Sequence, residues 1–281
     1  MKTTLHTLLL IWLLGPAISH AQYRDENRVN RFLSHSMNAA GDVFAWYDAP
    51  VFFFYFVNRY EALQSAGKPV LIHATGLERE VATEFGVRGS ESFGSLDPFA
   101  LPHAILGART IQILAIELLS EEGDAEEEMR HAFGLYRSVM YTQVATQTVK
   151  SLVHRMRPDG SDDKSFFSGH TSVAFATCSW LQMELDDAIM ASESLGERPL
   201  LRDALRVAAA ASTYGWASYV GYSRIRDNKH YLGDVMTGAA VGVLISHLTY
   251  AAIHNGAPTF LDSFGVGIAD GRPAVSFVYS F

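Results

Sequence analysis

Three short stretches of the chain concentrate residue types that bind anions and transfer protons. The first contains Lys150 and Arg157, which are seven residues apart and precede Pro158. Seven residues make nearly two turns of α-helix, so both cations would lie on one face. Pro158 disfavours a helical backbone at the residue before it. Taken alone, the pair is also typical of a solvated basic helix face that ends at a proline.

The second stretch is Ser168-Gly169-His170, which opens a largely apolar run. Ser168 suits a helix N-cap, and Gly169 permits close approach of the backbone. A helix N-terminus offers free N–H groups and a favourable field, which together bind an anion such as phosphate. His170, in the first turn, would lie beside that anion. On its own, the motif is equally typical of simple helix capping.

The third stretch carries Arg224, His230 and Asp234. The planar guanidinium of Arg224 suits phosphate oxygens. His230 and Asp234 are four residues apart at the start of a long apolar helix, so their side chains would share one face. A carboxylate there can hold the imidazole in one tautomer. Alone, the spacing is also that of an exposed helical pair, which contributes only about a few tenths of a kcal/mol.

Together the three stretches read Lys-x6-Arg-Pro, Ser-Gly-His and Ser-Arg-x5-His-x3-Asp. This order and spacing resembles the signature of the type 2 phosphatidic acid phosphatase and vanadium-dependent haloperoxidase superfamily. The resemblance covers about residues 102–254. Phe167 stands where the family usually has a proline, which would preset the backbone before the helix cap. Phe167 leaves every chemical group of the motif in place, so the departure concerns the backbone before the helix cap and not the roles of the residues.

The resemblance implies an all-α helical bundle of the acid phosphatase and haloperoxidase type, with these roles. The side chains and backbone groups that hold phosphate are Lys150, Arg157, Ser168, Gly169 and Arg224. His230 attacks phosphorus and forms a phosphohistidine, Asp234 orients His230, and His170 protonates the leaving alcohol. Because the His230 ring must be neutral to attack and the His170 ring must be protonated to act as the acid, turnover is expected to have a bell-shaped pH dependence.

The leading hypothesis is a metal-independent phosphatase for phosphate monoesters, either a lipid phosphate or a small soluble ester. No further His, Asp or Glu set has metal-ligand spacing, so no cofactor is expected. The first alternative is a vanadate-dependent haloperoxidase, because vanadate mimics the pentacoordinate phosphoryl transition state and would occupy the same pocket. The second is a phosphate- or lipid-binding module without catalysis.

The charge balance of the chain narrows its partners. It has 22 Lys and Arg against 30 Asp and Glu, a formal net charge of −8. Such an acidic protein is not expected to bind nucleic acid, and a phosphate site must concentrate its positive charge locally.

The single cysteine, Cys178, excludes an intramolecular disulfide. Its apolar surroundings favour a buried structural thiol over a catalytic one.

Helical spacing dominates the chain, and no segment shows the alternation of a parallel βαβ sheet. Helices are predicted at about 28–40, 47–64, 78–86, 102–121, 126–156, 169–191, 199–220 and 230–254. The tail differs, because apolar residues alternate on both sides of Asp270-Gly271. This pattern predicts a β-hairpin, which would pack on the helical body or pair with a partner.

The N-terminus has the three parts of a secretory signal peptide: Lys2, an apolar run from Leu8 to Leu14, and a small-residue exit ending at Ala21. An uncleaved anchor is the alternative. The predicted divisions are a signal peptide at 1–21, an N-terminal helical region at 22–101, a phosphatase core at 102–254 and a tail at 255–281. The protein is expected to be exported, and periplasmic or membrane-associated.

Residues 235–261 contain no Asp, Glu, Lys or Arg, a length that suggests a membrane span or a buried core helix. The helices predicted at 102–121 and 126–156 carry several charges, and the mean hydropathy of +0.07 is low for a protein with many spans. A soluble or peripherally membrane-bound domain is therefore favoured over an integral one.

Five aromatic residues could line an apolar approach for a lipid substrate or fill the helical core: Phe166, Phe167, Trp216, Tyr219 and Tyr222.

Overall fold

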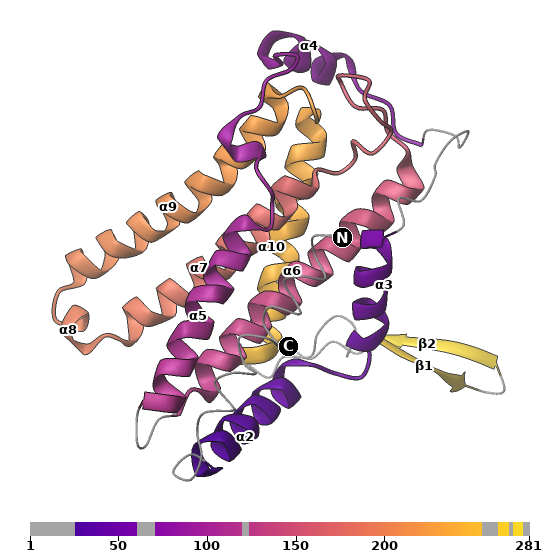
Figure 1. Ribbon diagram of the computed structural model, residues 1–281. Helices are drawn as coiled ribbons and strands as arrows, with labels where there is room; N and C mark the ends of the chain where they lie inside the picture. The colour runs from indigo at the N-terminus through magenta and orange to yellow at the C-terminus, as the bar shows by residue number, and fades with distance from the viewer. Residues whose placement is uncertain (1–25, 61–70, 120–123, 255–263, 270–271, 278–281) are drawn as a thin grey trace. The chain divides into compact units, whose positions relative to one another are not determined.

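The computed structural model describes residues 26–60, 71–119, 124–254, 264–269 and 272–277 (Figure 1). Its helices are α2 Glu26–Val43, α3 Asp48–Tyr60, α4 Gly76–Phe85, α5 Ala100–Leu119, α6 Glu126–Val153, α7 Gly169–Ala191, α8 Glu193–Gly196, α9 Pro199–Arg226 and α10 Leu232–His254. A 3-10 turn, η1, spans Phe93–Ser95. The prediction of an all-α fold is confirmed. The expected signal peptide lies outside the described residues.

Most helix ends lie within a few residues of the predicted ones, and three differences affect the site: the ends of α6 and α9, and the start of α10 at Leu232 rather than at 230. Helix α6 ends at Val153, where the next residue, His154, adopts a positive φ of 50° that an α-helix cannot continue. Helix α9 continues to Arg226, six residues past the predicted end at 220. Arg224 therefore lies in the last turn of a helix rather than in a loop.

The C-terminal tail contains two short strands, β1 Phe264–Ala269 and β2 Arg272–Phe277. They pair antiparallel, with Phe264 opposite Phe277. The turn expected at Asp270-Gly271 lies outside the described residues.

The chain divides into two compact units, one made of the residues up to Val43 with Gly107–Phe133, the other of Phe44–Leu106 and Gly134–Phe281. The first unit is organised around Glu117, which is fully buried. Arg31 Nε donates to Glu117 Oε2 at 3.1 Å, and His35 Nδ1 lies 2.6 Å from Oε1. Helix α2 is thereby tied to the end of α5. The division predicted at 22–101, 102–254 and 255–281 stays a prediction.

In the second unit, α7 packs against both α9 and α10, which run alongside it in Figure 1. Glycines let α10 approach α7 closely. A Cβ on Gly238 would lie 2.7 Å from the Ser168 carbonyl oxygen, and one on Gly242 would clash with the Ser172 carbonyl oxygen and lie 2.9 Å from the Ala176 amide. Small residues at four-residue spacing thus bring the two helix backbones together. This contact fixes the first turns of α7, where the Ser-Gly-His motif lies.

Between α7 and α9 the core is made of small and medium apolar side chains: Ala174, Cys178, Ala217 and Val220. Burial raises the pKa of the Cys178 thiol to about 12. The thiol is therefore a structural group rather than a nucleophile, in agreement with the interpretation from sequence.

Helix α10 is the one helix of the described ranges that is long and apolar enough to cross a bilayer, and core helices commonly share that property.

Replacing Gly242 by alanine is expected to destabilise the folded protein by about 1–3 kcal/mol, because the new methyl group meets backbone atoms that can move only with α7. Denaturant unfolding measures the change. Gly215→Ala in α9 is the matched control: nothing lies within 4 Å of its Cβ position, so it should be neutral or stabilising by up to about 1 kcal/mol. Equal unfolding midpoints for the two variants would contradict the packing described here.

Candidate active site

Three cations converge in the second unit although they come from three different places in the chain. Lys150 lies in the last turn of α6, Arg157 in the loop that follows, and Arg224 in the last turn of α9. Lys150 and Arg224 are buried. The prediction that Lys150 and Arg157 share one helix face is wrong, because α6 ends four residues before Arg157.

The electrostatics of the three side chains show how close they are. Burial, together with the charges of Arg157 and Arg224, lowers the pKa of Lys150 to about 7. Burial and the charge of Arg157 lower the pKa of Arg224 to about 10. Arg224 Nε is buried without a hydrogen-bond partner in the described part of the chain. Like charges held this way attract an anion that offsets them.

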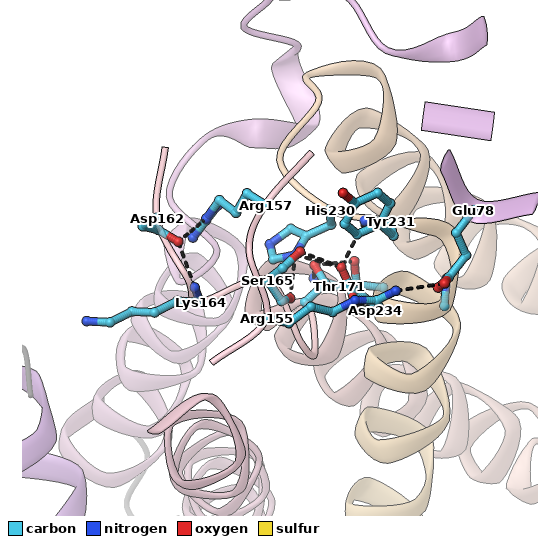
Figure 2. A network of polar contacts seen from close by, with 12 residues as sticks. Glu78, Arg155, Arg157, Asp162, Lys164, Ser165, Thr171, His230, Tyr231 and Asp234 are labelled. Carbon is cyan, nitrogen blue, oxygen red and sulfur yellow. Dashed lines mark hydrogen bonds and ion pairs between the residues drawn. The ribbon is translucent and has the colours of Figure 1, made fainter. Parts of the chain in front are cut away.

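The loop that carries Arg157 folds back on itself. Arg157 N–H donates to the Asp162 carbonyl oxygen at 2.9 Å, and its Nε donates to Asp162 Oδ1 at 2.6 Å (Figure 2). Asp162 thus holds the side chain by Nε alone. The two terminal NH2 groups, which have no partner within the described ranges, remain for an anion.

Helix α7 begins at the second motif, as predicted. Ser168 is the N-cap: its Oγ accepts from the Thr171 amide at 3.5 Å and from Thr171 Oγ1 at 2.9 Å. A Cβ on Gly169 would lie 3.8 Å from Lys150 Nζ, so the ammonium group lies against this helix start. The free N–H groups of α7 and the Lys150 charge therefore point to one anion position.

Both histidines are neutral near pH 7 in this environment. Burial and the charges of Arg224, His230 and Lys150 lower the pKa of His170, in the first turn of α7, to about 3. Burial, partly opposed by Asp234, lowers the pKa of His230 to about 3 as well. A neutral His230 suits a nucleophile. A proton on His170 requires negative charge beside it.

His230 precedes α10, which begins at Leu232, so its contact with Asp234 is made from the turn before the helix rather than within one continuous helix. His230 Nδ1 lies 2.7 Å from the Ser165 carbonyl oxygen and 3.8 Å from Asp234 Oδ2 (Figure 2). A carbonyl oxygen only accepts, so Nδ1 carries the hydrogen and Nε2 keeps its lone pair. The carboxylate of Asp234 acts as an N-terminal cap for α10, accepting from the Tyr231 amide at 2.8 Å.

The sequence did not single out two partners of Asp234. Arg155 donates from one terminal nitrogen to Asp234 Oδ1 at 2.5 Å, and Ser165 Oγ donates to Oδ2 at 2.5 Å. Glu78, from α4, accepts from the other terminal nitrogen of Arg155 at 2.7 Å. Arg155 and Ser165 flank two of the motifs, which is a weak signal. Nothing in the sequence connects Glu78 to them.

The structure thus brings all the predicted site residues into one place. Lys150 is influenced by the charges of Arg157, Arg224 and Asp234, and His170 by those of Arg224, His230 and Arg157. The Ser168 amide donates to the Asp234 carbonyl oxygen at 3.0 Å, which joins the second and third motifs.

The affinity for sulfate, whose charge is constant over this range, should fall about tenfold between about pH 6 and about pH 8.5. The reason is that Lys150 is protonated below a pKa of about 7 and loses its charge as the pH rises through that value. Isothermal titration calorimetry at several pH values measures the affinity. Lys150→Arg, which keeps its charge, should show a much shallower profile, and Lys164→Arg should keep the wild-type slope. A flat wild-type profile would contradict this assignment.

Comparison with known proteins places these residues in a family. The family model described as "PAP2 superfamily" matches residues 131–257, which include all three motifs. A lipid A 1-phosphatase of Porphyromonas gingivalis is 36% identical over 96 residues, covering 34% of this chain and 18% of that protein. Lipid phosphate phosphatase 2 of Arabidopsis thaliana is 29% identical over 153 residues, covering 44% of this chain and 51% of that protein. The matches thus span about half or less of each relative's length.

Among solved structures, a transmembrane PAP2 type phosphatidylglycerolphosphate phosphatase from Bacillus subtilis aligns with a TM-score of 0.42 and 18% identity, covering 80% of this chain and 94% of that one. Residues 131–257, which carry the cation cluster and both histidines, match the PAP2 superfamily, and this part of the chain resembles that family.

Proposed function

We propose that the protein is an exported phosphatase that hydrolyses phosphate monoesters through a phosphohistidine on His230, with a lipid phosphate as the favoured substrate class. One observation carries the proposal: three cations converge with a helix N-terminus beside a neutral, buried histidine whose Nε2 is unprotonated. Phosphoryl transfer needs little more than such positioning and charge stabilisation.

In the first step, the Nε2 lone pair of His230 forms a bond to phosphorus while the bond from phosphorus to the ester oxygen breaks. The leaving oxygen takes a proton from His170. Lys150, Arg157 and Arg224 stabilise the charge on the equatorial oxygens. In the second step, water attacks the phosphohistidine and gives its proton to His170, which releases inorganic phosphate and free enzyme.

The ionisation of His170 depends on the substrate. Burial and the nearby cations lower its pKa to about 3 in the free enzyme. A bound phosphate dianion opposes those positive charges and raises the pKa of His170, so His170 becomes protonated when the substrate binds. Turnover needs a protonated His170 and a neutral His230. The bell-shaped pH dependence therefore stays the prediction, with its acidic limb from His230.

The lipid substrate class rests on the named relatives and on an apolar surface near the cations. Phe93 and Leu96 are 64% and 56% exposed. Their segment is fixed to the end of α9, because Asp227 accepts hydrogen bonds from Ser92 and Ser95. An acyl chain would have apolar side chains to contact while its phosphate lies at Arg224, the arginine of that helix end.

The aromatic residues considered from the sequence divide between the two interpretations. Phe167 is buried, and Tyr219 and Tyr222 are exposed. Trp216 contacts Phe93 edge to face, with ring centroids 5.7 Å apart. Trp216, which also contacts the Tyr219 ring, thus joins the Phe93 surface to the core cluster between α7 and α9, whereas Phe167 belongs to the core.

His230→Ala should lower turnover of an aryl phosphate by about 10³-fold or more, since nothing replaces the nucleophile.

His170→Ala should lower turnover of an alkyl phosphate by about 10²–10⁴-fold and that of an aryl phosphate much less, because an aryl leaving group needs no acid. Phosphate release by purified full-length protein measures both. His247→Ala, an exposed histidine of α10, is the control.

Unchanged hydrolysis in His230→Ala would sink the phosphohistidine mechanism. Loss of wild-type activity in a chelator would contradict the proposal that no metal is used. Halide oxidation with peroxide and vanadate, in place of ester hydrolysis, would favour the haloperoxidase alternative.

Replacing both Phe93 and Leu96 by serine should raise KM for a long-chain lipid phosphate in mixed micelles by about tenfold, because each exposed apolar side chain contributes about a kcal/mol of contact. KM for a soluble aryl phosphate should stay within about twofold. Equal KM values for wild type and variant on the lipid would remove the argument for this surface. Leu200→Ser in the exposed first turn of α9 is the control.

A further inference from the structure

A continuous set of hydrogen bonds connects helix α4 to the ring of His230 (Figure 2). It passes from Glu78 to Arg155, from Arg155 to Asp234, and from Asp234 to Ser165, whose carbonyl oxygen accepts from His230. Arg155, Asp234 and Ser165 are almost fully buried, with exposed fractions of 3%, 0% and 0%. Burial makes each of these contacts stronger and each loss of a partner more costly.

We infer that Glu78 and Arg155 are positioning residues for the nucleophile, acting on His230 through Asp234 and Ser165. Helix α4, which lies outside the matched residues 131–257, thereby completes the active site. The inference rests on the proposed function, in that His230 is the nucleophile.

The direct support of His230 is the backbone at Ser165. The carbonyl oxygen of Ser165 sets the Nδ1–H tautomer, because it is 2.7 Å from Nδ1 while the nearest Asp234 oxygen is 3.8 Å away. Ser165 is itself held at both ends. Its N–H donates to the Arg155 carbonyl oxygen at 2.9 Å, and its Oγ donates to Asp234.

The charge of Arg155 keeps Asp234 ionised. Its guanidinium lies between the carboxylates of Asp234 and Glu78, with one carboxylate on each terminal nitrogen. The guanidinium carbon is 4.7 Å from the centre of the Tyr231 ring. Without this cation, the buried carboxylate of Asp234 would have the partly buried carboxylate of Glu78 near it and no charge between them, which favours protonation of one of the two. A protonated Asp234 would hold Ser165 differently. Lysine keeps the charge but cannot bridge both carboxylates.

Glu78 is held rigidly enough to place Arg155. Burial acts to raise the pKa of Glu78, but the Thr75 amide and Arg155 outweigh it and keep the pKa below its usual value. The carboxylate accepts from the Thr75 amide at 2.8 Å and from the Gly233 amide at 3.2 Å. A Cβ on Gly233 would clash with Glu78, so α4 lies directly against the start of α10.

The test compares full-length Glu78→Gln, Arg155→Lys and the double variant with wild type. Kinetics on a soluble aryl phosphate give kcat and KM, calorimetry gives the sulfate affinity, and 15N NMR of the histidine side chains reports the His230 tautomer. Glu80→Gln and Glu84→Gln, on the exposed side of the same helix, are the matched controls.

We expect kcat to fall about 10–100-fold in each single variant, because a misplaced nucleophile loses rate without losing substrate. KM and sulfate affinity should stay within about twofold, since Lys150, Arg157 and Arg224 are untouched. The double variant should be no worse than the worse single one, because both changes break the same connection. The His230 signal should shift from the Nδ1–H form toward a mixture.

An unchanged kcat in Glu78→Gln overturns the inference, and so does a parallel loss of kcat, sulfate affinity and unfolding free energy. Because Glu78→Gln is nearly isosteric, its kcat alone tests the inference if Arg155→Lys does not fold. Absence of turnover in wild type overturns the proposed function instead. The NMR comparison then still decides whether Glu78 and Arg155 position His230.

Discussion

The repulsion among Lys150, Arg157 and Arg224 is the constraint on which the rest of the site depends. Three like charges held together, two of them buried, are unfavourable, and the lowered pKa values of Lys150 and Arg224 reflect that cost. The fold keeps them in place with fixed hydrogen bonds, such as the one from Arg157 Nε to Asp162. The result is an anion site in a protein whose net charge is −8.

Close packing of helix backbones supplies much of that rigidity. Gly238 and Gly242 bring α10 against the start of α7, so the helix N-terminus, Ser168 and Asp234 are held together by backbone contacts rather than by long side chains. The Glu78–Arg155–Asp234 connection extends the same support to α4. Two neighbouring histidines can then stay neutral, one with its lone pair free and the other ready to receive a proton when an anion arrives.

The sequence predicted the all-α fold, most helix bounds and the set of residues that meet at the site. It did so because capping, helical periodicity and residue chemistry are local properties. The prediction from sequence was wrong where a turn, rather than a helix, connects two site residues. The i,i+4 relation of His230 and Asp234 assumed one continuous helix, but α10 starts at Leu232 and Ser165 takes the expected place of the carboxylate.

Contacts of long sequence separation were also out of reach. Glu78 is 77 residues from Arg155, and no spacing rule joins them. The fixing of Ser92 by Asp227, 135 residues away, is of the same kind. Such contacts depend on how helices pack, and packing is decided by the shapes of many side chains together.

The central claim is that His230 carries the phosphoryl group during turnover. The most direct measurement is mass spectrometry of peptides from protein quenched in base during turnover of an aryl phosphate, since phosphohistidine survives base and not acid. The account predicts a phosphoryl group on His230 that disappears when substrate is exhausted. A phosphoryl group on another residue, or steady turnover with no phosphorylated peptide at any quench time, would contradict it.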